Sequence, residues 1–107
     1  DQAKVKYISS DELNKIIGSE KNIYLIDLRS NSQFVLSHLK GSINIPLADL
    51  ENEENKIPPG KKIILYDIDG LGAFKGAVRL YDLGFFNVLC LSDGLETWQK
   101  KGFEIIK

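Results

Sequence analysis

The chain has 107 residues, of which 43% are hydrophobic and 27% are charged, which predicts one domain with one core over residues 1–107. Its net charge of −1 combines 14 basic with 15 acidic residues and no arginine cluster, which argues against a nucleic-acid partner. No apolar run reaches the roughly 18 residues of a membrane helix and no signal peptide is present, so we expect a cytoplasmic protein without a membrane partner. Because the first residue is Asp1 rather than Met, we expect a piece of a longer protein or a processed product.

One cysteine and one histidine limit the metal and redox chemistry of the chain. Cys90 cannot form an internal disulfide, and the sequence has no C-x-x-C pair. His38 alone argues against a His-based metal centre. We therefore expect neither a metal nor another cofactor.

The first half of the chain predicts strands that alternate with helices. Ser9 and Glu12 have the spacing of a capping box, which opens a helix that Gly18 ends. The expected elements, in chain order, are a strand at 5–8, a helix from Ser9 to Gly18, a strand at 23–26, a helix from Ser30 or Asn31 through Leu36, a strand at 43–45, and a brief helix at 47–54 whose solvated face carries Glu51, Glu53 and Glu54.

The second half continues the alternation after the turn at Pro58-Pro59-Gly60. Small residues near the start of its first helix would let that helix pack close to a sheet. The expected elements are a strand at 63–66, a helix at 73–83, a strand at 88–91, and a last helix from Asp93-Gly94 to Gly102. Alternating strands and helices predict an α/β fold with a mainly parallel sheet.

A short glycine-containing loop, Asp67 to Gly72, joins the fourth expected strand to its helix and organises the rest of the chain. Backbone N–H groups that converge at a helix N-terminus form a cradle for an anion. This loop is therefore the candidate site. Its candidate binding residues are Asp67, Ile68, Asp69, Gly70, Leu71 and Gly72, with Arg29 as a further one.

Three other segments resemble the rhodanese-like domains, a sulfurtransferase family whose fold some phosphatases share. They are Asp27-Leu28-Arg29 (the family's D-x-R), residues 37–47 (H-x-x-G-A-x-N-I-P-L) and residues 84–98 (G-F-x-x-V, then L-x-G-G-x-x-x-W). The resemblance covers essentially the whole chain. It implies a five-stranded, mainly parallel sheet with helices on both faces.

The loop departs from this family at two positions. The resemblance implies a cysteine after the fourth strand, which carries a sulfane sulfur as a persulfide, and often an arginine at the end of the loop. Asp67 stands at the cysteine position and Gly72 at the arginine position. A carboxylate cannot hold a persulfide, so we expect no catalytic residue here. We hypothesise that Asp67 instead accepts the N–H groups of its own loop and fills the anion site, while Asp69 adds a second negative charge.

A finer resemblance concerns the loop and the helix after it. Gly70-Leu71, Phe74, Arg79 and Leu80 are similar to the pattern of rhodanese domains fused to flavin- and NADH-dependent coenzyme A-disulfide or persulfide reductases. This resemblance implies a protein partner or a covalently linked flavoprotein domain.

A competing motif interpretation gives the same loop a different chemistry. Residues 63–71 match h-h-h-h-D-x-D-G, the first motif of haloacid-dehalogenase-type phosphatases, in which Asp67 would be the nucleophile and Asp69 the acid/base with Mg²⁺. That chemistry also needs a later lysine and an acidic pair. The only acidic candidates, Asp93 and Glu96, lie in the segment that resembles rhodaneses.

The remaining candidate residues have structural interpretations that we favour. Cys90 and Trp98 are expected in the core. His38 is expected to form hydrogen bonds within its own turn. Asp27 and Arg29 are expected to form an ion pair or backbone hydrogen bonds at the strand end, although Arg29 could line the loop.

The leading interpretation is a catalytically degenerate rhodanese-like domain that serves as a structural, regulatory or interaction module within a larger redox protein. The alternative is a sulfurtransferase, or a thiol- or persulfide-binding partner domain of a pyridine nucleotide-disulfide oxidoreductase. A Mg²⁺-dependent phosphatase is a minor alternative. Whether the isolated chain is an enzyme stays open.

Overall fold

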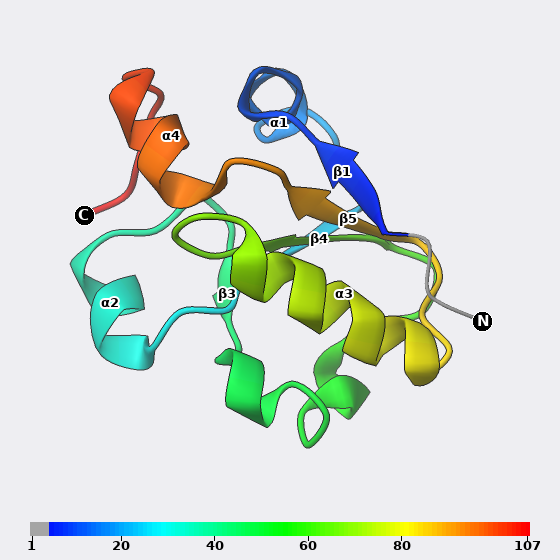
Figure 1. The fold of residues 1–107 in the computed structure, drawn as a ribbon. Helices are drawn as coiled ribbons and strands as arrows, with labels where there is room; N and C mark the ends of the chain where they lie inside the picture. The colour runs from blue at the N-terminus through cyan, green and yellow to red at the C-terminus, as the bar shows by residue number, and fades with distance from the viewer. Residues whose placement is uncertain (1–4) are drawn as a thin grey trace.

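The computed structural model describes residues 5–107 and has an α/β fold built on one five-stranded sheet (Figure 1). The strand order is β1-β5-β4-β2-β3, and every pair of neighbouring strands is parallel. The strands are β1 (Lys6–Ile8), β2 (Ile23–Asp27), β3 (Ile43–Asn44), β4 (Lys62–Tyr66) and β5 (Val88–Leu91). The expected fold class is confirmed, and the sheet is fully rather than mainly parallel. The one antiparallel pairing in the described part is an isolated bridge between His38 and Ile106.

Helices cover both faces of the sheet, as the sequence predicted (Figure 1). The α-helices are α1 (Ser10–Ile16), α2 (Asn31–Leu36), α3 (Leu71–Asp82) and α4 (Gly94–Lys100). Leu13 of α1 and Leu95 and Trp98 of α4 pack into one core cluster, while Ala73, Ala77 and Leu80 of α3 pack into another. The sheet therefore separates two cores, with α1 and α4 above it and α3 below it in the view of Figure 1.

Side-chain caps fix where the first two helices begin. The Ser9 hydroxyl accepts the N–H of Glu12 at 3.1 Å, and the Glu12 carboxylate accepts the N–H of Ser9 at 3.1 Å. Ser30 and Gln33 form the same reciprocal arrangement at the start of α2. The predicted capping box is thus confirmed, and Ser30 rather than Asn31 is the cap of the second helix.

The predicted brief helix at 47–54 is wrong. The chain forms two separate 3₁₀ turns instead, η1 (Leu47–Asp49) and η2 (Glu54–Lys56), neither of which has a side-chain cap. Leu50 and Ile57 are both buried in the core cluster that α3 also enters. The chain between them bends so that both side chains reach this core, and it therefore does not form one continuous helix. The acidic residues between these anchors also disfavour a helix, because negative charge near a C-terminus opposes the helix dipole.

Gly76, in the middle of α3, lets this helix pack close to the sheet. A side-chain carbon built on Gly76 would lie 3.0 Å from a methyl carbon of Leu28 and 3.1 Å from one of Leu65. The predicted close packing is therefore confirmed. The helix begins at Leu71, two residues before the predicted start, so the candidate loop is shorter than expected.

The carboxyl ends of the parallel strands meet at one edge of the sheet. The loop before α3 follows β4, and α2 follows the neighbouring strand β2, so both leave the sheet at this edge (Figure 1). The start of α4 follows β5 on the other side of β4. No helix within residues 5–107 is long and apolar enough to cross a membrane.

Candidate functional site

Asp67 is the first residue after β4, and its side chain turns back into its own loop. One carboxylate oxygen accepts the N–H of Gly70 and the other accepts the N–H of Gly72, both at 2.7 Å. Only 9% of Asp67 is exposed. The two contacts join the strand end to the first turn of α3, so the carboxylate lies where converging N–H groups would meet an external anion.

Gly72 is the residue that leaves room for this carboxylate. A side-chain carbon built at position 72 would lie 2.6 Å from the Asp67 oxygen that accepts the Gly72 N–H. Gly72 does not have a positive φ, so backbone conformation alone does not require glycine here. The requirement for a small residue at 72 comes from the side chain at 67.

Two other glycines interlock the loop with the turn before α4. Gly70 has a φ of +100°, and a side-chain carbon there would lie 2.4 Å from the carbonyl oxygen of Ser92. Gly94 has a φ of +74°, and a side-chain carbon there would lie 2.4 Å from the carbonyl oxygen of Ile68. The sequence predicts only a turn at Asp93-Gly94, and the contact of Gly94 with Ile68 was not predicted. Gly94 matches the second glycine of the rhodanese-like motif L-x-G-G-x-x-x-W, and this match was the only signal of its importance in the sequence.

The N-terminus of α4 strengthens the same contact. The N–H of Leu95 donates to the carbonyl of Asp67 at 2.8 Å, and the N–H of Glu96 donates to the carbonyl of Ile68 at 3.0 Å. Within the loop, the Asp69 carboxylate accepts the N–H of Leu71 at 3.0 Å. The loop backbone is therefore held by three sets of bonds, of which only one involves the side chain of Asp67.

Arg29 is engaged with Asp27 rather than with the loop. The guanidinium donates two hydrogen bonds from Nε to the Asp27 carboxylate at 3.1 Å and one from a terminal nitrogen at 2.7 Å. It also donates to the carbonyl of Ser37. The side chains of Arg29 and Asp27 are only 7% and 0% exposed. Burial opposes the positive charge, but the hydrogen bonds and charge of Asp27 outweigh it and raise the pKa of Arg29.

A buried hydroxyl network that the sequence did not predict lies directly before the loop. The Tyr66 hydroxyl accepts the N–H of Leu39 at 3.0 Å and donates to the Ser42 hydroxyl at 3.0 Å, which donates in turn to the carbonyl of Leu39 at 2.7 Å. Burial raises the pKa of Tyr66 well above its usual range. Tyr66 therefore stays a neutral hydroxyl that ties the segment 39–42 to the end of β4.

The other candidate residues adopt the expected structural roles. Cys90 is fully buried, its thiol donates to the carbonyl of Ala73 at 3.2 Å, and burial together with the charge of Asp67 raises its pKa to about 12. A ring nitrogen of His38 bonds the carbonyl of Phe34 at 2.8 Å within the same turn. Trp98 is 1% exposed in the core. Within residues 5–107, no group of three or more His, Cys, Asp or Glu side chains could hold a metal ion.

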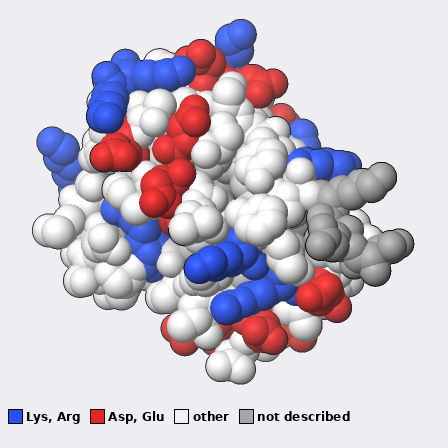
Figure 2. Space-filling model, in the orientation of Figure 1, with Lys and Arg blue, Asp and Glu red and all other residues white. Residues whose placement is uncertain are grey.

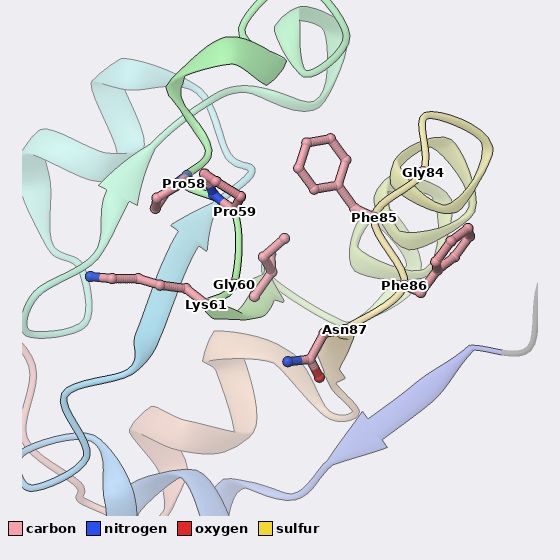
Figure 3. Close-up of a pocket in the computed structure, with 9 residues that line it drawn as sticks. Pro58, Pro59, Gly60, Lys61, Gly84, Phe85, Phe86 and Asn87 are labelled. Atoms are coloured by element: carbon pink, nitrogen blue, oxygen red, sulfur yellow. The ribbon is translucent and has the colours of Figure 1, made fainter.

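A hollow of about 230 Å³ lies at the opposite edge of the sheet, near the amino ends of β4 and β5 (Figure 3). The ring of Phe85 faces Pro58 and Pro59 across this hollow, whereas Phe86 and the ammonium group of Lys61 point away from it (Figure 3). Its lining is thus mostly apolar, and Lys61 is the one ionisable residue among those that line it.

Comparison with known proteins identifies the family. The model of the "Rhodanese-like domain" matches residues 9–101. A sulfurtransferase from Allochromatium vinosum is 21% identical over 95% of this chain and 95% of its own length. A rhodanese-related protein from Thermoplasma volcanium has a similar structure, with a TM-score of 0.85, 21% identity, and coverage of 94% of this chain and 97% of that one.

A second solved structure, reduced CoADR-RHD from Bacillus anthracis, is 28% identical with a TM-score of 0.79. The match covers 88% of this chain but only 16% of that much longer chain. The family match spans most of the 107 residues, and the fold agrees with that of the rhodanese-related protein from Thermoplasma volcanium. The chain belongs to the rhodanese-like domain family.

Proposed function

We propose that this chain is a rhodanese-like domain that does not itself transfer sulfur, and that it serves as an interaction or regulatory module, within a larger redox protein. The observation that carries the proposal is the double hydrogen bond of Asp67, at 2.7 Å to the N–H groups of Gly70 and Gly72. An internal carboxylate then takes the place of an external anion, and no thiol is available at this position to accept sulfur.

The electrostatics of the loop support this proposal. Asp67 and Asp69 place two carboxylates within three residues, and both accept backbone N–H groups of the loop. A thiosulfate or sulfate ion would have to displace a covalently attached anion and approach the second one. Arg29, the one cation among the candidate binding residues, is already paired with Asp27.

Cys90 does not supply the missing nucleophile. Its thiol is fully buried, and a pKa of about 12 leaves almost no thiolate at neutral pH. Transfer of a sulfane sulfur requires a thiolate that reaches the donor, so Cys90 supports the non-catalytic proposal.

A second candidate function is a sulfur- or thiol-handling partner domain of a pyridine nucleotide-disulfide oxidoreductase. The likeness to CoADR-RHD, at 28% identity, favours it together with the local pattern from Gly70 to Leu80. In this second function, a cysteine of another domain or chain would supply the nucleophile, and this loop would only bind the thiol or persulfide. The phosphatase alternative has less support, because both oxygens of Asp67 accept N–H groups and are poorly placed as nucleophiles.

A thiosulfate:cyanide sulfurtransferase assay on the purified chain tests the proposal. We expect no thiocyanate above the rate without protein. The positive control is the double variant Asp67→Cys with Gly72→Arg, in which we expect at least partial sulfur loading at position 67, measured as a mass increase of one sulfur. Turnover by the unmodified chain that is lost in Asp67→Asn would overturn the proposal.

A crystal soak with sulfate or thiosulfate tests the occupied cradle separately. We expect no anion between residues 67 and 72, and a well-occupied anion there would contradict the role given to Asp67. Hydrolysis of an aryl phosphate that needs Mg²⁺ and is abolished by Asp67→Asn would instead support the phosphatase alternative.

A further inference from the structure

We propose that the surface around the candidate loop binds a polypeptide segment that carries lysine or arginine beside apolar side chains. This inference rests on the proposed function, in which the domain binds rather than catalyses, and it names the kind of partner. We call the surface the loop patch. It consists of the apolar side chains of Ile68, Leu71 and Phe74 and the acidic side chains of Asp69, Asp93 and Glu96.

The apolar part of the loop patch is unusually exposed for so short a stretch. Ile68 is 43% exposed, Leu71 61% and Phe74 42%, although they lie within seven consecutive residues. Single exposed apolar residues are normal, whereas a local group of them is typical of a binding surface.

The acidic part lies next to the apolar part because α4 packs on the loop. The N–H of Glu96 donates to the carbonyl of Ile68 at 3.0 Å, and Gly94 packs against the peptide between Ile68 and Asp69. Asp93, which precedes Gly94, therefore lies beside the same peptide. Figure 2 shows acidic side chains over the start of α4 and the adjoining loop, with uncharged surface on one side of them and basic side chains above them.

These carboxylates have no cation of their own in the described part of the chain. None of the four ion pairs found within residues 5–107 includes Asp69, Asp93 or Glu96. Two exposed cations are close to the patch in sequence: Lys100 follows Glu96 by four residues on α4, and Lys75 follows Phe74 on α3; neither belongs to these four ion pairs. A partner whose cations face α4 and whose apolar side chains face Leu71 would therefore match both the charge and the surface.

The shape of the site favours a polypeptide over a small molecule. Asp67 already accepts the converging N–H groups of the loop, so the side chains left for a partner are the exposed ones of Ile68, Leu71 and Phe74. The hollow described above lies at the opposite edge of the sheet and is separate from the loop patch. An extended or helical segment can cover exposed side chains that no enclosed pocket surrounds.

The test is a titration of the ¹⁵N-labelled chain with a synthetic amphipathic peptide of Leu and Lys, followed by NMR. We expect saturable shifts at residues 68–75 and 93–96, and weaker binding as salt is added. The same peptide with Glu in place of Lys should not bind. Leu71→Ser should weaken the affinity about tenfold, as expected for a lost buried leucine contact.

Phe86→Ser is the matched control, because Phe86 is also highly exposed (64%) but lies at the opposite edge of the sheet. It should leave the affinity unchanged. The double variant Asp93→Asn with Glu96→Gln tests the charge without touching the apolar group and should remove most of the salt dependence. Absent shifts, shifts centred elsewhere, equal binding of the Glu peptide, or equal effects of Leu71→Ser and Phe86→Ser would overturn the inference. None of these outcomes bears on the sulfurtransferase assay, which tests the proposed function independently.

Discussion

Replacing Gly72 by alanine should destabilise this protein, although the same change usually stabilises a helix. Gly72 is the second residue of α3 and has no positive φ, so helix propensity alone favours alanine by up to about 1 kcal/mol. The added carbon, however, would lie 2.6 Å from the Asp67 carboxylate. The carboxylate must therefore move, and its hydrogen bonds to Gly70 and Gly72 are lost or weakened.

The size of the effect follows from these two bonds. Hydrogen bonds to a charged group contribute about 1.5–3 kcal/mol each. Water can reach the freed N–H of Gly72, which is half-buried, whereas the N–H of Gly70 is buried, so we expect a loss of about 2–3 kcal/mol for the pair. After the gain in helix propensity, Gly72→Ala should cost about 2 kcal/mol net when Asp67 is present. In an Asp67→Ala background it should instead stabilise the fold by about 0.5–1 kcal/mol.

Urea unfolding followed by the fluorescence of Trp98 measures both effects, since Trp98 is the only tryptophan and is buried. With an m-value of about 1 kcal/mol/M, a loss of 2 kcal/mol lowers the midpoint by about 2 M. Gly18→Ala is the control, because a side-chain carbon there would meet nothing within 4 Å. Buffers should contain no sulfate or phosphate. If Gly72→Ala has the same effect with and without Asp67, the coupling between positions 67 and 72 is wrong.

Three further predictions test other parts of the structure. Arg29→Ala should cost about 3 kcal/mol in urea unfolding because it leaves the buried Asp27 carboxylate unpaired. Lys101→Ala, which removes an exposed ion pair, should cost less than about 1 kcal/mol, and equal costs would contradict the assigned role of Arg29. Cys90 should react with iodoacetamide at pH 8 only after unfolding, since its pKa is about 12; fast labelling of the native chain would refute its burial. Hydrogen bonds from Ser9 lower the pKa of Glu12 from 4.5, so Glu12 stabilises the fold above pH 4.5 and this contribution is lost as pH falls through the lowered value. Glu12→Gln should therefore flatten the fall in thermal midpoint below pH 4.5, and an unchanged acid limb would show that the cap does not contribute.

The alternation of strands and helices was predictable because its signals are local. Apolar runs locate the strands, and the Ser9 and Ser30 caps locate two helix starts, without knowledge of the rest of the chain. The prediction of a helix at 47–54 was wrong for the opposite reason. The backbone path of this segment depends on where Leu50 and Ile57 enter the core that α3 covers. Neither the composition of the segment nor the spacing of its apolar residues indicates where that core lies.

The candidate loop was predictable from its position after a strand, but its packing was not. The sequence identified Asp67 and the converging N–H groups. It did not reveal that Gly94, 24 residues after Gly70, is required by contact with the Ile68 carbonyl, nor that Tyr66 bonds the segment 39–42. Those contacts join residues far apart in the chain, and one sequence without its tertiary arrangement carries no direct record of them.

The interlock of Gly70 with Ser92 and of Gly94 with Ile68 has an evolutionary consequence. Both contacts are made by backbone atoms, so they do not depend on which side chain occupies position 67. Selection for a stable fold is enough to preserve the backbone course of this turn, even where selection for a particular reaction is absent. Members of a family built this way can exchange the reactive group for another residue and keep the backbone course of the turn, although a carboxylate at position 67 also requires a small residue at position 72.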